Sequence, residues 1–197
     1  MLTKTIIENI FLLIGESFWA FSVIAQLRKV LKTHKTHGLS APSITLNAAG
    51  NIGWIVYFIH RQLWFPVATN IVVVTGAILL LGAVLENNRL QYRRGLAAIF
   101  TIGPLTSLLL IGFPAIGGWL GMSYNWIAGT PWLIHVMTSK KLTGISTHSL
   151  FFTWGAITSV LIYGSLIHAT PLVVGSLQGI AYQIVIGKRY FKYRHQG

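Results

Sequence analysis

The chain has 197 residues, of which 53% are hydrophobic and only 9% are charged. A water-soluble domain carries about a quarter charged residues, so this composition excludes an ordinary soluble surface. The net charge of +12 comes from short basic blocks between apolar segments, which is typical of membrane topology signals rather than of a nucleic-acid-binding face. The absence of cysteine excludes a disulfide scaffold and thiol chemistry.

Seven apolar segments follow one another along the chain with short connections. A helix needs about 20 apolar residues to cross a bilayer, and helices are expected because hydrocarbon cannot satisfy free backbone groups. The segments are too continuously apolar for barrel strands. We predict an all-α membrane protein whose seven transmembrane helices cover Ile6–Leu27, Ser43–Phe58, Leu63–Leu85, Leu96–Phe113, Ile116–Met137, Leu150–Ile167 and Pro171–Tyr190.

The first segment follows Lys4 and has the start of a signal peptide. Because Glu8 and Glu16 interrupt it and no clean cleavage site follows, we expect a retained first helix. Glu16 is the only acid well inside an apolar segment, where a charge costs about 3 kcal/mol at the bilayer centre. It is a candidate for proton coupling, and the alternative is a neutral glutamic acid bonded to a neighbouring helix.

The second segment carries Asn47, Asn51 and Trp54 at spacings that place them on one helical face. Amides are costly in hydrocarbon, so this face should point into the bundle. The amide of Asn51 and the flat ring of Trp54 suit a small neutral polyol or a zwitterion. Hydrogen bonding between helices is the alternative, and Asn47 fits either that structural role or a place near the inner gate.

The basic residues predict the orientation of the chain. With the N-terminus outside, only Lys4 and Arg61 of the 15 basic residues lie on the outer side. The positive-inside rule therefore predicts a cytoplasmic C-terminus and an odd number of helices. We expect the protein in the plasma membrane. The basic residues expected inside are Arg28, Lys29, Lys32, Lys35, Arg89, Arg93, Arg94, Lys140, Lys141, Lys188, Arg189, Lys192 and Arg194.

A shift of 106 residues aligns the chain with itself without gaps, and Gly38 then falls on Gly144. The shared pattern is a helix end, a basic turn, Gly-Leu-Ser or Gly-Ile-Ser, and a new helix that the serine can cap. Four helices separate the two turns, so both lie on the same face and the two units are parallel. We predict a 3+1+3 plan with units at 1–85 and 115–197 and a linker helix at 86–114.

The two turns and the helix ends before them resemble the PQ-loop superfamily, and within it the SWEET and SemiSWEET sugar transporters. That family carries Pro-Gln at the end of the first helix of each unit, where this chain has Ala25-Gln26 and Pro131-Trp132. A second similar stretch begins at Gly53 and includes Trp54, Tyr57, Arg61, Pro66 and Asn70.

The resemblance implies that Trp54 and Asn70 line a substrate cavity between the two units. The equivalent residues of the second unit are Val160 and Ser176, so this cavity would be asymmetric. The gate residues implied by the resemblance are Tyr57, Arg61, Gln26 and Pro131.

Polar residues of the second unit are candidates to complete the cavity. Gln178 lies one turn before Tyr182 on the last helix, and Asn125 precedes Pro131 within the fifth. We therefore add Asn125, Ser176 and Gln178 to the expected substrate contacts. The tryptophans near them fit equally well as interfacial or packing residues.

These observations predict a transporter of a small polar solute that works by alternating access, with a sugar as the first expectation. A proton-coupled amino acid or vitamin transporter is the alternative, as is a non-transporting receptor of the same fold. The sequence shows no phosphate loop, nucleophile elbow or paired carboxylates, so we expect no enzyme. Scattered histidines predict no metal site, and no cofactor is expected. The expected partners are the bilayer and the solute, not nucleic acid, and self-association is left open.

Overall fold

The computed structural model describes residues 2–60, 62–86 and 88–193, and this part of the chain forms seven helices. The prediction of an all-helical chain with seven helices is therefore confirmed. The helices are α1 Leu2–Thr33, α2 Ala41–His60, α3 Trp64–Val84, α4 Arg89–Gly112, α5 Pro114–Thr138, α6 Thr147–Leu166 and α7 Thr170–Tyr193.

Several helices extend beyond the apolar segments that predicted them, because backbone hydrogen bonding continues into their polar ends. Helix α4 begins at Arg89 rather than near Leu96, since Asn88 Oδ1 accepts the N–H of Gln91 at 3.0 Å and caps the helix. Helix α1 continues to Thr33, and the next residue, His34, leaves the helix with a φ of 52°.

Four helices of the described part are long and apolar enough to cross a membrane, namely α1, α3, α6 and α7. Helices α2 and α4 have 20 and 24 residues, which span roughly 30 Å or more at about 1.5 Å per residue. Large apolar side chains cover the outside of the bundle, and Leu108 and Phe151 are each 68% exposed. Such a surface suits lipid rather than water.

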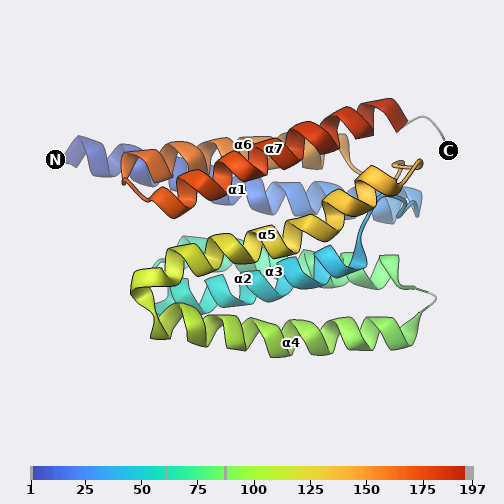
Figure 1. The fold of residues 1–197 in the computed structure, drawn as a ribbon, viewed down its shortest axis with the longest axis horizontal. Helices are drawn as coiled ribbons and strands as arrows, with labels where there is room; N and C mark the ends of the chain where they lie inside the picture. Colours follow the sequence, from blue (N-terminus) through green and yellow to red (C-terminus); the bar gives the residue numbers. More distant parts are fainter. Residues whose placement is uncertain (1, 61, 87, 194–197) are drawn as a thin grey trace.

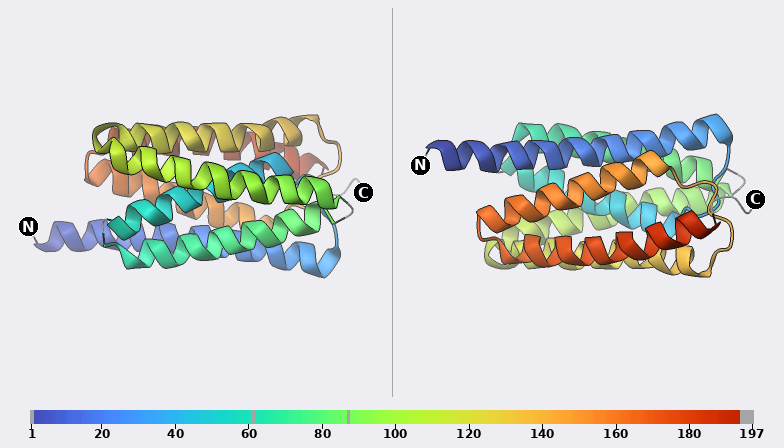
Figure 2. Two further views of the ribbon diagram at one scale, coloured as in Figure 1. Left: turned by 90° about the horizontal axis from the view of Figure 1, so that it is seen from below. Right: turned by 90° about the horizontal axis from the view of Figure 1, so that it is seen from above.

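The helices lie along one common axis and alternate in direction, so the two termini lie at opposite ends (Figure 1). The α1–α2, α3–α4 and α5–α6 turns and the end of α7 gather at one end, which we call the basic end (Figures 1 and 2). Near it lie the four basic blocks of the sequence, at residues 28–35, 89–94, 140–141 and 188–192. The α2–α3, α4–α5 and α6–α7 turns form the opposite end.

The order of packing is the same in the first and last three helices. Helix α3 packs against both α1 and α2, and α7 packs against both α5 and α6. Two further pairs join these groups, α1 with α6 and α2 with α5. Helix α4 packs mainly against α2 at the edge of the bundle (Figure 1).

Two buried clusters form the core. One lies among α2, α3 and α4 and contains Ala48, Ala77, Leu81 and Ile99. The other lies among α5, α6 and α7 and includes Leu142 and Ile145 of the α5–α6 turn, both almost fully buried. This turn is therefore part of the core rather than a solvated loop.

Candidate functional site

The α1–α2 turn (residues 34–40, the first turn) and the α5–α6 turn (residues 139–146, the second turn) meet at the basic end. The N–H of Gly144 donates to the carbonyl of His37 at 2.9 Å. A Cβ on Gly144 would collide with the backbone of residues 35–37, so this approach requires glycine. Gly38 has a φ of 96°, in the left-handed region that also favours glycine.

Gln26 joins the end of α1 to the second turn. Its side chain is 7% exposed, its Nε2 donates to Gly144 O at 2.7 Å, and its Oε1 accepts the N–H of Ser146 at 2.8 Å. Ser146 in turn caps α6, because its Oγ accepts the N–H of Ser149 at 3.3 Å. Both ends of the Gln26 amide are thus used to hold the turn that starts α6.

The contacts between the turns recur at equivalent positions. Trp132 follows Gln26 by 106 residues, and Gly144 follows Gly38 by the same interval. While Gln26 donates to the carbonyl of Gly144, Trp132 Nε1 donates to the carbonyl of Gly38 at 3.2 Å. In each case the side chain at the end of one helix therefore donates to the carbonyl of the glycine in the turn of the other repeat.

A second pair of contacts repeats this reciprocity deeper in the bundle. Ser22 Oγ on α1 donates to Ser149 O on α6 at 3.1 Å, and Ser43 Oγ on α2 donates to Ala128 O on α5 at 2.7 Å. Ala128 follows Ser22, and Ser149 follows Ser43, by 106 residues. We call the two interfaces the α1–α6 seam and the α2–α5 seam.

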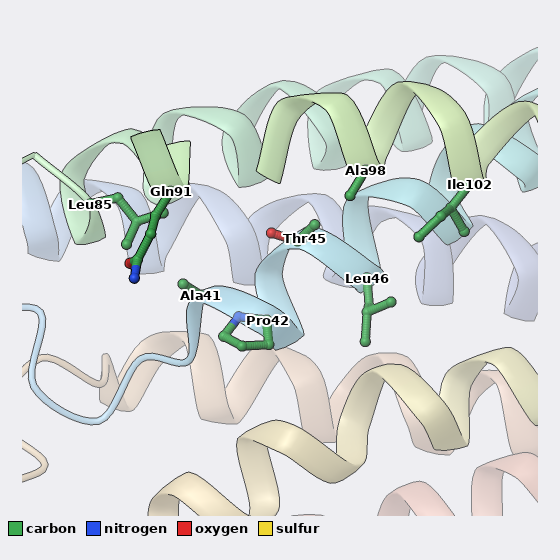
Figure 3. A pocket seen from close by; sticks show the side chains of 8 residues that line it. All are labelled: Ala41, Pro42, Thr45, Leu46, Leu85, Gln91, Ala98 and Ile102. Carbon is green, nitrogen blue, oxygen red and sulfur yellow. The ribbon is translucent and has the colours of Figure 1, made fainter. Parts of the chain in front are cut away.

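Two grooves flank the start of α2 at the basic end. One, of about 450 Å³, lies between α2 and α4, where Thr45 and Gln91 supply its polar atoms (Figure 3). The other, of about 500 Å³, lies on the α2–α5 seam and is lined by Leu39, Ser40, Ala41, Pro42, Pro131, Ile134, His135 and Thr138. Pro131, expected to be a gate residue, thus borders a groove, whereas Trp54 and Asn70 line neither.

Asn70 and Glu16 lie together between α3 and α1. Asn70 is 6% exposed, and its Nδ2 donates to Glu16 Oε2 at 3.2 Å and to Pro66 O at 2.8 Å. Thr69 Oγ1 donates to the same Glu16 oxygen at 2.7 Å. The acid and the amide that the sequence offered for separate roles therefore form one cluster, towards the end opposite the basic end.

Trp54 is half-buried in an aromatic group on α2. Its ring stacks on Phe58 with centroids 5.6 Å apart and meets Tyr57 edge-on at 5.5 Å. Trp54 lies six residues before the end of α2, and Asn70 lies six residues after the start of α3. At about 1.5 Å per residue, the two lie at similar depth below the α2–α3 turn.

The two amides of α2 bond to each other. Asn51 Nδ2 donates to Asn47 O at 2.7 Å and to Asn47 Oδ1 at 3.2 Å. In the last helix, Ser176 is buried and Gln178 is half-buried. Arg61 and the side chain of Asn125 lie outside the described part of the chain.

The sequence alone did not predict the contacts of several structurally important residues. Lys29 was counted only as a topology charge, but its Nζ donates to Ile145 O at 2.5 Å. Thr69 gives no signal in the sequence, because a threonine in an apolar helix commonly bonds its own backbone. The 106-residue shift also places Ser43 on Ser149, and this identity is a signal in the sequence for the serine contacts of the seams.

Residues 7–67, from α1 to the start of α3, match the PQ loop repeat family. This agrees with the resemblance seen at the first turn. The match shows a PQ-loop repeat over this segment alone, and the four apolar helices of the described part are those of a multi-pass membrane protein. No curated protein and no solved structure matches the chain significantly.

Proposed function

We propose that the chain is a transporter that moves a small polar solute, with a sugar as the first candidate, by alternating access. Two three-helix units, residues 1–85 and 115–197, would rock against each other, with residues 86–114 as the linker helix. The reciprocal hydrogen bonds of Gln26 with Gly144 and of Trp132 with Gly38 carry this proposal. They support two equivalent units related by an axis along the membrane normal, a known plan for transporters.

The interlocked turns favour a conformation that is closed at the basic end. This end is cytoplasmic in our proposal, because it gathers the basic blocks, and the N-terminus is then outside. Release of the Trp132 contact with Gly38 would open this side while the opposite side closes. Pro131 within α5 removes one backbone hydrogen bond and so gives the helix a place to bend.

The solute site of this proposal lies between the units at the depth of Trp54 and Asn70. A half-buried indole gives an apolar face for a sugar ring, and amides give donors and acceptors for its hydroxyls. The sugar transporters that the sequence resembles use a tryptophan and an asparagine at these positions. Tyr57, Arg61, Asn51, Asn125, Ser176 and Gln178 remain proposed contributors to the site or its gate.

The test begins with a thermal-shift screen of the purified protein against sugars, amino acids and vitamins, because a ligand stabilises the state that it binds. Flux of each hit is then measured in liposomes. We expect Trp54→Ala to weaken apparent affinity about tenfold or more, equivalent to ~1.4 kcal/mol. The matched control is Trp64→Ala, because Trp64 is 66% exposed at the start of α3.

The control should transport as the wild type does. Equal flux in both variants would remove Trp54 from the site. A hit that binds and stabilises the protein but shows no flux would favour a receptor over a transporter.

A further inference from the structure

Glu16 has no basic partner on the helices that pack against it. Helix α1 packs against α3 and α6, and α3 has no titratable residue between Trp64 and Val84. On α6 the titratable residues are His148, near the basic end, and Tyr163, which interacts electrostatically with Glu8 and Tyr57. Among the residues that the structure describes, an ionised Glu16 would therefore have only the neutral donors Thr69 and Asn70 as hydrogen-bond partners.

On α1 itself the charged residues are also distant from Glu16. Arg28, Lys29 and Lys32 follow it by twelve residues or more, which is at least ~18 Å along the helix. Lys4 precedes it by twelve residues, and Glu8 precedes it by two turns. A buried charge without a counter-ion is costly, so a proton is the simplest way to make this position neutral.

The amide of Asn70 has no free hydrogen in this arrangement. A primary amide carries two N–H donors, and Asn70 directs them to Glu16 Oε2 and Pro66 O. A solute hydroxyl that accepts an N–H from Asn70 must therefore compete with Glu16 or with the backbone. The bond to Glu16 is the longer of the two, 3.2 Å against 2.8 Å, and is the easier one to give up.

The hydroxyl of Thr69 can serve both protonation states of Glu16. Its Oγ lies 2.7 Å from Glu16 Oε2, 3.0 Å from Pro66 O and 3.3 Å from Phe65 O. When Glu16 is charged, Thr69 donates its single hydrogen to the carboxylate. When Glu16 is protonated, the acid donates to Thr69 Oγ, and Thr69 redirects its hydrogen to Pro66 O. Neither arrangement leaves a hydroxyl hydrogen unused.

We propose that Glu16 is a proton-binding site whose occupancy is controlled by the amide of Asn70. In the empty site the Asn70 N–H stabilises the carboxylate. When a solute takes that N–H, Glu16 loses a donor and binds a proton from the water at the end opposite the basic end, and Thr69 accepts the new O–H. The role of the solute rests on the proposed function, and it makes this transporter a proton–solute symporter.

Infrared spectroscopy of the protein in liposomes can test this without any solute. The chain has only three acidic side chains, Glu8, Glu16 and Glu86, so its carboxyl bands are few. We expect a protonated-carboxyl C=O band that changes with pH, disappears in Glu16→Gln and persists in Glu8→Gln and Glu86→Gln.

Replacement of Asn70 tests the second half of the proposal. Asn70→Ser removes the donor, and the equivalent residue of the second unit is already a serine, Ser176. We expect Asn70→Ser, but not Asn47→Ala on α2, to show more protonated Glu16 at a fixed neutral pH. Circular dichroism checks that each variant is folded, and Asn70→Ala is the second variant should the serine restore a hydrogen bond.

Three results would overturn the proposal. The first is a Glu16 carboxyl band that does not change between about pH 5 and 9. The second is a band that is the same in both Asn70 variants and in the wild type. The third is a band that changes when sodium replaces choline in the buffer at a fixed pH. Solute flux without any of these carboxyl changes would support the transporter and contradict the symport. The expected carboxyl response without solute flux would support the proton site and contradict the transporter.

Discussion

The α1–α6 seam and the α2–α5 seam join the same two groups of helices through equivalent positions, yet they are built differently. At the first, Ser22 Oγ contacts Ser149 O, Ser149 Oγ and Thr153 Oγ1, and Gln26 makes two hydrogen bonds. At the second, the described side chains make one bond from Ser43 and one from Trp132. Among the residues whose side chains the structure describes, the first seam has more polar contacts than the second.

The residues at positions 29 and 135 show the difference most clearly. Lys29 reaches across the first seam to Ile145 O. His135, its equivalent, stays on its own helix, with Nε2 3.5 Å from Ser139 Oγ, and lines the groove of the second seam. A lysine side chain therefore crosses the first seam, whereas the second seam has a groove of about 500 Å³. We expect the units to separate first at the α2–α5 seam and to pivot about the α1–α6 seam.

The largest expected effect is that of Gln26→Ala. It removes two buried hydrogen bonds and leaves the carbonyl of Gly144 and the N–H of Ser146 without their partner. Unsatisfied buried polar groups cost about 1–3 kcal/mol each, so we expect the unfolding free energy to fall by about 2–4 kcal/mol. Denaturant unfolding in micelles, followed by circular dichroism, measures the loss.

The control for that experiment is Trp132→Phe, which removes the single equivalent bond and keeps most of the apolar volume. It should cost ~1 kcal/mol or less. Equal losses in the two variants would show that the seams have the same strength.

The serine contacts give a smaller test of the same comparison. Ser22→Ala removes a buried hydroxyl with partners on two residues of α6, and we expect a loss of about 1–2 kcal/mol. Ser43→Ala removes one bond of a half-buried hydroxyl and should cost about 0.5–1 kcal/mol. A double-mutant cycle of Ser22→Ala with Thr153→Ala should show coupling, because the two hydroxyls are 2.7 Å apart. Additive effects would mean that this contact contributes nothing of its own.

The smallest effect on stability is expected for Lys29→His, which gives the first seam the residue of the second. The lysine amine can return to water, so folding should change little. The change should instead open a groove beside α6, where Thr147 is the equivalent of Ala41. Since the chain has no cysteine, a single Thr147→Cys reports the opening through faster maleimide labelling. Unchanged labelling would show that Lys29 does not close this seam.

Much of the fold could be predicted from the sequence. The apolar runs marked all seven helices, and the serines of the two turns, Ser40 and Ser146, were expected to cap the next helices. Both accept the N–H of the residue three positions later, at 3.4 Å and 3.3 Å. The basic blocks predicted one basic end. These features depend on local sequence, which hydropathy and capping patterns report directly.

The partners of the candidate site residues could not be predicted. Helix α3 is apolar on nearly all its faces, so periodicity gives no indication of which side meets α1. The pairing of Asn70 with Glu16 depends on that rotation. Gln26 was expected at a gate because of the family resemblance, but its bonds depend on how the second turn lies, 118 residues away in sequence.

The reciprocal bonding of Gln26 and Trp132 has a consequence for how such an interface can diverge. If the two groups of three helices were identical subunits of a dimer, every substitution would change both seams at once. A single continuous chain removes that restriction. Position 26 can keep an amide that bonds twice while position 132 takes an indole that bonds once. Position 29 can likewise carry a lysine that crosses one seam while position 135 carries a histidine that lines the groove of the other. Covalent continuity thus allows one seam to specialise as a pivot and the other as the interface that separates.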